Sequence, residues 1–250
     1  MRDKKNGLVD DLNDLKAFAD AMSPGELIVI SGASGTGKTT LALRIAQALV
    51  GPDVEDETAK SKRALVFTPK HDSEFFVDKG LCRRRIYIDD FRFLDVAAVD
   101  SRTRAMRRVF GVDLLIVDSV QSLRANSGSP VLASVPDATR ELRDLGVELG
   151  IPVLLVSERP DAAFCGGECE YAALGDSSSA ADVMICLRRN SETGATTYCM
   201  SRKVERPSAA ECRIAECGFV EERREAFHGC NSSGVGPLRI RKRCQYSNVQ

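Results

Sequence analysis

The chain has 250 residues, of which 43% are hydrophobic and 28% are charged, a composition that excludes a disordered or fibrous protein. Its 35 Lys and Arg residues nearly balance 36 Asp and Glu residues, so the formal net charge of -1 excludes nucleic-acid binding through overall charge alone. This length is near the upper limit for one hydrophobic core, so we expect one domain with at most a small appendage.

Apolar runs and cysteines indicate the cellular compartment. No apolar run approaches the roughly 20 residues that span a bilayer, and the charged first 15 residues lack the apolar stretch of a signal peptide. We therefore expect a cytoplasmic protein without a membrane partner. The nine cysteines are an odd number in a chain too large to need disulfides, which favours reduced thiols. Cys165 and Cys169 are spaced like half of a metal site, but no second pair of zinc-binding spacing accompanies them, so free thiols are preferred.

Apolar runs alternate with helical patterns along most of the chain. The first run, residues 26–31, leads into a glycine-rich loop and a helix over 39–49. Further strands are expected at 64–68, 85–88, 113–118, 151–157, 182–187 and 196–200, and further helices at 73–80, 96–109 and 137–149. This alternation predicts an α/β fold with a mainly parallel twisted sheet flanked by helices. Fewer helices follow residue 151, which indicates an antiparallel extension at the C-terminal edge of the sheet.

The glycine-rich loop fits a phosphate-binding pattern. Residues 32–39, Gly-Ala-Ser-Gly-Thr-Gly-Lys-Thr, match G-x-x-x-x-G-K-[ST] between a strand and a helix, which disfavours a glycine-rich turn with an incidental lysine. Such a loop curls its backbone N–H groups around an anion at the positive end of the helix. Lys38 is expected to contact the terminal phosphates of ATP, and the Thr39 hydroxyl to bind magnesium (Mg2+). The predicted nucleotide-binding residues are Gly32, Ala33, Ser34, Gly35, Thr36, Gly37, Lys38, Thr39 and Thr40.

A second magnesium ligand is expected from another strand. Asp118 ends the apolar run Asp-Leu-Leu-Ile-Val-Asp. An aspartate at a strand end is more often a helix cap or a turn residue. The apolar run before it, and the two strands that separate it from Thr39, favour the metal-binding role.

Two longer segments resemble a known family. Residues 116–123, Ile-Val-Asp-Ser-Val-Gln-Ser-Leu, and residues 138–157, which contain Gly-Ile-Pro-Val, resemble the core of DnaB-type replicative helicases. The chain is similar, almost as closely, to RadA/Sms recombination ATPases and KaiC-like proteins of the same RecA-like superfamily. The lead-in at 23–30 and residues 180–187 also fit the pattern, so the resemblance covers roughly residues 8–220. We therefore expect a RecA-like P-loop ATPase domain over 1–220 and a basic, flexible tail over 221–250.

The resemblance implies an ATPase that assembles as a homo-oligomeric ring or filament, holds nucleotide between subunits and binds single-stranded DNA along its axis. Two departures from that pattern concern the chemistry of hydrolysis. Lys70 stands where the family has its catalytic glutamate, and a charged lysine cannot accept a proton. Asp72 and Glu74 are the nearby candidates for that base. Glu158 stands where the family has a phosphate-sensing glutamine, and its charge repels phosphate unless a cation intervenes.

The family also has a pair of cationic residues that reach a neighbouring subunit's nucleotide. Residues 201–207, Ser-Arg-Lys-Val-Glu-Arg-Pro, are an approximate counterpart. Arg202 matches the first position and Val204 falls at the second, so Lys203 or Arg206 is the expected substitute. For each of them alone, an exposed basic residue without catalytic function is an equally good interpretation.

The family's DNA-binding loop corresponds to residues 171–179, in which its arginine and glutamate are missing. Gly175 and Ser177 remain as donors to the phosphates of single-stranded DNA. Basic residues cluster at 83–85 and 102–108, and the second cluster is interpreted as an ordinary solvated helix face. The most favourable phosphate-binding cluster is in the tail, because no acidic residue compensates Arg239, Arg241, Lys242 and Arg243.

Two functions of different classes are compatible with these features. The first is an ATP-dependent DNA motor or DNA-remodelling ATPase, of the DnaB or RadA/Sms kind. The second is a nucleotide-binding switch or scaffold with weak hydrolysis, for which Lys70 and Glu158 are the reason. A P-loop kinase is a third and weaker alternative, because no lid-like arginine segment follows in the expected place.

Overall fold

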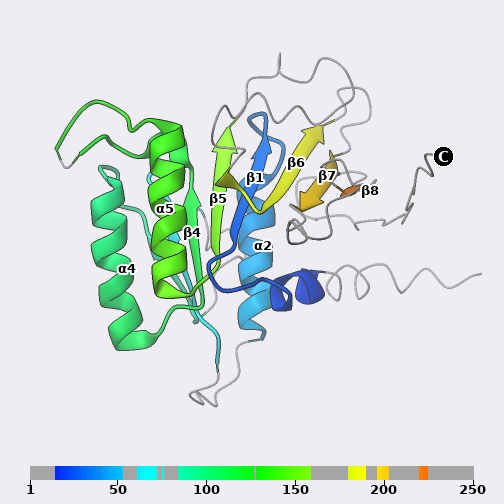
Figure 1. The fold of residues 1–250 in the computed structure, drawn as a ribbon, viewed down its shortest axis with the longest axis horizontal. Helices are drawn as coiled ribbons and strands as arrows, with labels where there is room; N and C mark the ends of the chain where they lie inside the picture. The colour runs from blue at the N-terminus through cyan, green and yellow to red at the C-terminus, as the bar shows by residue number, and fades with distance from the viewer. Residues whose placement is uncertain are drawn as a thin grey trace, which may run out of the picture.

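The computed structural model describes residues 15–52, 61–71, 75, 84–126, 128–158, 180–189, 196–202 and 220–224. After a short helical segment at 15–20, the elements follow one another as shown in Figure 1. They are β1 (Leu27–Gly32), α2 (Lys38–Val50), β2 (Ala64–Phe67), β3 (Ile86–Asp89), α4 (Val96–Phe110), β4 (Leu114–Asp118), the 3-10 helix η1 (Val120–Ser122), α5 (Val135–Leu149), β5 (Val153–Glu158), β6 (Val183–Arg189), β7 (Thr196–Arg202) and β8 (Val220–Arg224).

The strands form one sheet in the order β3-β2-β4-β5-β1-β6-β7-β8. Every pairing from β3 to β6 is parallel, because helical or looped connections return the chain to the same end of the sheet. The last two pairings, β6 with β7 and β7 with β8, are antiparallel. The structure therefore confirms the predicted α/β class with a mainly parallel sheet and an antiparallel extension.

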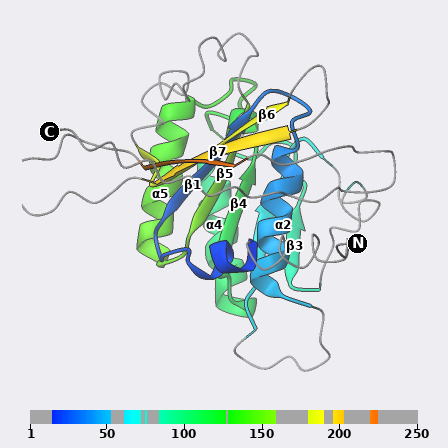
Figure 2. The same ribbon diagram turned by 90° about the vertical axis from the view of Figure 1, so that its right-hand side faces the viewer.

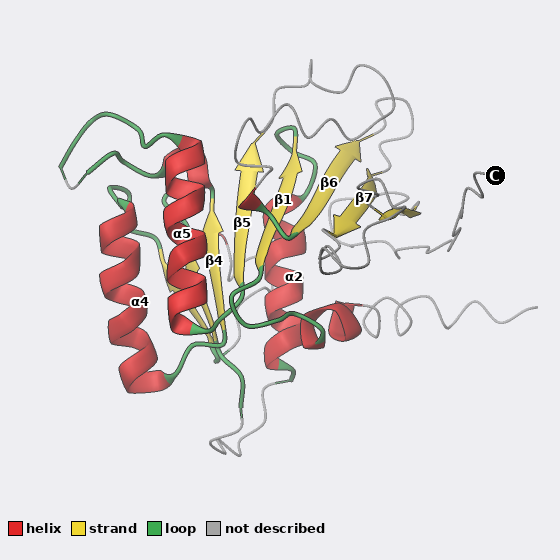
Figure 3. Ribbon diagram, in the orientation of Figure 1, coloured by secondary structure: helices red, strands yellow, loops and turns green. Residues whose placement is uncertain are grey.

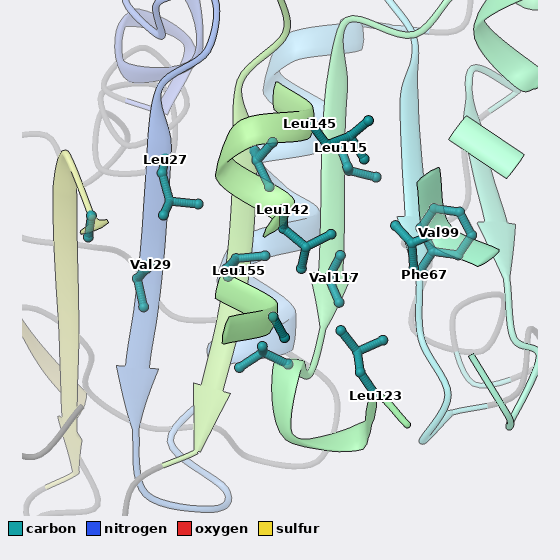
Figure 4. Packing of buried hydrophobic residues seen from close by; sticks show 14 of the residues in the cluster. Leu27, Val29, Phe67, Val99, Leu115, Val117, Leu123, Leu142, Leu145 and Leu155 are labelled. Atoms are coloured by element: carbon teal, nitrogen blue, oxygen red, sulfur yellow. The ribbon is translucent and has the colours of Figure 1, made fainter. Parts of the chain in front are cut away.

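Helices cover both faces of the sheet, as the turned view in Figure 2 shows. Successive residues of β1 point to opposite faces. Ile28 and Ile30 pack with α2 and the partly buried Phe18 of the first helical segment, whereas Leu27 and Val29 pack toward α5. Figure 4 shows the second core, in which strand side chains meet Leu142 and Leu145 of α5. Burial on both faces explains why these strands read as continuous apolar runs.

The helix boundaries follow from local chemistry. The side chain of Asp95 accepts a 2.7 Å hydrogen bond from the backbone nitrogen of Ala98 and so caps the first turn of α4. α5 begins at Val135, two residues before the predicted start, with Pro136 in its first turn, where a missing N–H costs nothing. Of the predicted helix over 73–80, only residue 75 is described, and it is helical.

Two further features concern the ends of the fold. β8 begins at residue 220 and extends to residue 224, so it crosses the expected boundary between domain and tail. The division into residues 1–220 and 221–250 stays a prediction, because residues 225–250 lie outside the described part of the chain. Among the described residues, no helix combines the length and apolar character needed to cross a bilayer.

Candidate nucleotide-binding site

The parallel strands bring their carboxyl ends to one edge of the sheet. Figure 3 shows the arrowheads of β4, β5, β1 and β6 at the same edge. The loop that follows β1 turns there into α2, and its Gly35 and Gly37 adopt φ angles of 76° and 92°. Such positive values favour glycine, and a Cβ added at either position would meet nothing within 4 Å. The loop thus has an open side at the start of a helix, which suits a bound phosphate.

Gly37 occupies the N-cap position of α2, and no side chain there accepts a hydrogen bond from the first turn of the helix. The first N–H groups of an α-helix have no carbonyl partner within the helix, and they carry the positive end of its dipole. The side chains of the loop instead bond to its own backbone, since both the Thr36 hydroxyl and the Lys38 ammonium donate to the carbonyl oxygen of Ala33, at 2.9 and 2.6 Å. These hydrogen bonds therefore fix the shape of the loop and leave the first backbone N–H groups of α2 available to an anion.

Lys38 is buried, with 6% of its surface exposed. Burial lowers its pKa, and the carboxylates of Glu158 and Asp118 act in the opposite direction. Its ammonium therefore lies in a partly desolvated setting in which an anion is attracted more strongly than in water.

Asp118 ends β4, two strands away from β1 in the sheet. Its Oδ2 accepts a 2.6 Å hydrogen bond from the Thr39 hydroxyl. Burial raises the pKa of Asp118, and the Thr39 hydrogen bond partly offsets that rise. A hydroxyl and a carboxylate are the hard oxygen ligands that magnesium prefers, and a cation here would relieve the cost of burying the carboxylate. These two residues therefore fit the expected metal site.

Lys70 and Glu158, which both depart from the helicase pattern, are in contact. Lys70, three residues after the end of β2, places its Nζ 2.6 Å from Oε1 of Glu158, the last residue of β5. β4 lies between these two strands, so the ion pair reaches across the strand that carries Asp118. The hydrogen bond from Lys70 lowers the pKa of Glu158. The two side chains are 36% and 42% exposed, so the ion pair lies at the surface of this edge of the sheet.

Gln121 also belongs to this site, although the sequence indicated it only as part of a motif. It lies in η1, and its side-chain nitrogen donates to the hydroxyl of Ser157 at 2.7 Å and to the backbone oxygen of Glu158 at 3.3 Å. Its side-chain oxygen accepts from the backbone nitrogen of Glu158 at 3.2 Å. Gln121 therefore ties the end of β5 to the segment that follows β4. Its spacing from Asp118 was the signal in the sequence, but its partners were not predictable from it.

Several predicted site residues lie outside the described part of the chain. These are Asp72, Glu74, Gly175, Ser177, Lys203 and Arg206, together with Cys165, Cys169 and the basic residues of the tail. Arg202 is the last residue of β7, and only its backbone, paired with Val183 and Val220, is described. Within the described ranges, no group of three or more His, Cys, Asp or Glu residues is arranged for a metal ion.

The arginines of α4 bear on the predicted solvated face. Arg102 contacts Asp89 at 2.6 Å, and Arg104 contacts Glu148 of α5 at 2.7 Å. Arg107 donates to the backbone oxygen of Leu149. These arginines are engaged by acidic or carbonyl groups of the same chain, which favours the interpretation of a surface face over that of a phosphate-binding cluster.

Comparison with known proteins extends this picture. The family model of the DnaB-like helicase C-terminal domain matches residues 72–205, more than half of the chain. The chain belongs to the DnaB-like helicase C-terminal domain family. This membership confirms the resemblance drawn from the motifs around Asp118 and Gly-Ile-Pro-Val.

Individual members of the DnaB-like family are distant in sequence. The replicative DNA helicase DnaB of Geobacillus stearothermophilus is 22% identical over 178 residues, which cover 61% of this chain and 39% of that protein. The DnaB of Buchnera aphidicola is 26% identical over 183 residues, which cover 62% of this chain and 39% of that protein. The chain thus spans about two fifths of the length of these relatives.

Solved structures show the same fold. One solved structure, described as an ATPase domain, superimposes with a TM-score of 0.58 at 15% identity, covering 84% of this chain and 85% of that one. A DnaB-like replicative helicase, solved in a study of its interactions with primase, gives a TM-score of 0.56 at 14% identity, covering 88% of this chain and 65% of that one. The DnaB-like fold is therefore retained although few residues are identical.

Proposed function

We propose that this chain binds ATP with magnesium and hydrolyses it as the motor core of a helicase that acts on single-stranded DNA. The observation that carries the proposal is the 2.6 Å contact between the Thr39 hydroxyl and the Asp118 carboxylate, next to the buried Lys38. These three groups come from different parts of the chain, and together they match what a magnesium nucleotide needs. Membership of the DnaB-like family supports the same interpretation.

The residues would act as follows on the triphosphate. The amides of residues 32–40 surround the phosphates at the start of α2, and Lys38 exchanges the carbonyl of Ala33 for the terminal phosphates. Thr39 and Asp118 hold magnesium, which neutralises phosphate charge when bound.

Assembly and DNA contact are further parts of the proposal. We propose a homo-oligomeric ring or filament in which Arg202, with Lys203 or Arg206, reaches the nucleotide of a neighbouring subunit. Gly175 and Ser177 would donate to DNA phosphates, with residues 1–220 as the ATPase domain and 221–250 as a basic tail. The support is the family membership and the relatives' description as replicative DNA helicases. The cytoplasmic location expected from the sequence stays a prediction.

ATP binding and turnover test the proposal. Lys38→Ala is expected to weaken magnesium-ATP binding on the order of 10- to 100-fold, because it removes a charge-assisted contact to phosphate. Titration calorimetry measures this change, and Lys62→Ala, which alters an exposed lysine paired with Asp20, is the matched control. Equal affinity of the Lys38→Ala and unmodified proteins would remove the basis of the nucleotide site.

Hydrolysis and assembly are measured on the unmodified protein. Single-stranded oligonucleotide is expected to raise the ATP hydrolysis rate several-fold, and ATP, magnesium and oligonucleotide together are expected to shift the elution volume toward an oligomer. A protein that stays monomeric with both ligands would contradict the motor.

The second candidate function is a nucleotide-binding switch with weak hydrolysis. The ion pair between Lys70 and Glu158 favours it, because a lysine occupies the place of the family's catalytic glutamate. ATP would then change the oligomeric state without steady turnover. An oligomer that forms with ATP, together with hydrolysis that does not respond to DNA, is the result that would select this function.

A further inference from the structure

The ion pair between Lys70 and Glu158 lies close enough to the phosphate site to respond to a nucleotide. It spans the end of β4, the strand that carries Asp118. Among the charged groups, Glu158 raises the pKa of Lys38 most, ahead of Asp118, and Lys70 lowers it. Lys38, Lys70 and His71 in turn lower the pKa of both carboxylates, so these charges interact across the same edge of the sheet.

A triphosphate bound at Lys38 would act on the two members of the pair in opposite directions. Its terminal phosphate attracts the Lys70 ammonium and repels the Glu158 carboxylate. Both side chains are more than one third exposed, so each can move without breaking core packing. Binding of ATP is therefore expected to draw Lys70 away from Glu158.

The released carboxylate is suitably placed to act as a base. Of the two described carboxylates that act on Lys38, Asp118 is buried and already accepts a hydrogen bond from Thr39. Glu158 is open to solvent, and Gln121 holds its backbone through hydrogen bonds to both its nitrogen and its oxygen. A carboxylate with access to water, carried by a backbone that is held at the edge of the sheet where the phosphate loop lies, is suited to general-base catalysis.

We propose that Glu158 is the general base of ATP hydrolysis and that Lys70 holds it inactive until the terminal phosphate binds. The inference rests on the proposed ATPase function. In the step, the oxygen of a water molecule bonds to the γ-phosphorus while its proton passes to Glu158. The bond from the γ-phosphorus to the bridging oxygen breaks, and that oxygen leaves with the electron pair as part of ADP. Glu158 then returns the proton to solvent.

In this arrangement the catalytic carboxylate is on a different strand from the one implied by the family pattern. The carboxylate stands at the end of β5 rather than after β2, and the residue after β2 contributes a cation. Lys70 also gives the site a means to distinguish ATP from ADP, because only ATP supplies the γ-phosphate that competes with Glu158 for the ammonium.

The test measures binding and a single turnover on the full chain. Glu158→Gln is expected to keep ATP affinity within about threefold of the unmodified protein, because the amide no longer repels phosphate, and to slow hydrolysis by about 100-fold or more. Lys70→Met is expected to weaken ATP binding by about tenfold with ADP affinity unchanged, because it removes a contact that only the γ-phosphate makes.

The matched controls are Glu148→Gln and Arg104→Met. They break an ion pair of similar length, 2.7 Å, between α4 and α5, and are expected to leave binding and hydrolysis unchanged. Circular dichroism of all four variants checks that each one folds.

Two results would overturn the inference while the proposed function stands. They are hydrolysis by Glu158→Gln at the unmodified rate and equal losses of ATP and ADP affinity in Lys70→Met. A failure of the unmodified protein to bind or to hydrolyse ATP would instead overturn the proposed function itself, so the two failures are distinguishable.

Discussion

Two contacts of equal length lie at the same edge of the sheet but differ in their surroundings. Thr39 and Asp118 approach to 2.6 Å, and so do Lys70 and Glu158. Asp118 is only 5% exposed, whereas the side chains of the ion pair are 36% and 42% exposed. In the first contact, burial limits which residue types can replace Asp118, because a buried polar group needs a partner. In the second, water screens the charges, so residues of different charge are accommodated at little cost in stability.

The difference also separates what each contact can do. The contact between Thr39 and Asp118 joins the start of α2 to the end of β4 beside the apolar core, and its groups can hold an ion in one place. The exposed pair can open and close while the fold is unchanged.

The largest expected effect comes from crowding the close approach of β1 and β6 at Gly32, where the phosphate loop begins. A Cβ at Gly32 would lie 2.7 Å from the backbone oxygen of Leu187 and 2.8 Å from the Thr36 hydroxyl. Gly32→Ala should therefore separate β1 from β6, lower the free energy of unfolding by about 1–3 kcal/mol and reduce Tm by about 2–12 °C. Thermal denaturation measures it, with Ser34→Ala in the exposed part of the loop as the control for stability. An unchanged Tm would show that β1 and β6 can move apart at Gly32 at little cost in stability.

A smaller effect of opposite sign is expected from Asp118. Burial raises its pKa above the ordinary value of 3.8, so its cost to stability is absent below that value and grows as pH rises through the folded-state pKa. Asp118→Asn should therefore raise Tm by about 2–4 °C at neutral pH without magnesium, and the gain should vanish near about pH 3.

The check for Asp118 is a series of melting curves between acidic and neutral pH. The exposed Asp137, changed to Asn in the same way, is the control and should give no gain that depends on pH in this manner. A gain for Asp118→Asn that is the same at both ends of the pH range would contradict the cost assigned to burial.

The smallest expected effect on stability belongs to the ion pair. Its members are well exposed, so Glu158→Gln should change the free energy of unfolding by only about 0–1 kcal/mol. Lys70 lowers the pKa of Glu158 below 4.5, so this contribution is present above that value and is lost as pH falls through the folded-state pKa.

Salt sharpens the measurement on the pair. The difference in Tm between the unmodified protein and Glu158→Gln should shrink at about 1 M sodium chloride, where charges are screened within about 3 Å. If Glu158→Gln lost as much stability as Gly32→Ala, the ion pair would contribute far more to folding than an exposed pair should.

Much of the fold could be predicted because burial leaves a direct trace in the sequence. The apolar runs that became β4 and β5 are continuous because helices cover both faces of the sheet. The glycine-rich loop was recognisable because its geometry depends on local residue types at set spacing. β8, in contrast, reads Val-Glu-Glu-Arg-Arg and has no apolar pattern, so only its pairing with β7 reveals it.

The contact between Lys70 and Glu158 could not be predicted from the sequence, for a different reason. Lys70 and Glu158 each depart from the family pattern, but their contact depends on the sheet order that places β4 between β2 and β5. Whether two residues 88 positions apart touch is decided by that order and by the length of a lysine side chain, and neither is visible in a local pattern. The hydrogen bonds of Gln121 to the end of β5 were hidden in the same way.

The hydrogen bond from Lys38 to the Ala33 carbonyl has a consequence for ligand thermodynamics. An incoming polyphosphate must displace an acceptor that belongs to the loop itself, so the net gain at this position is the difference between a charged acceptor and a neutral one. Uncharged mimics of the polyphosphate chain would offer no such difference. The Ala33 carbonyl thereby competes with any ligand for the Lys38 ammonium, and only a strongly anionic ligand would displace it.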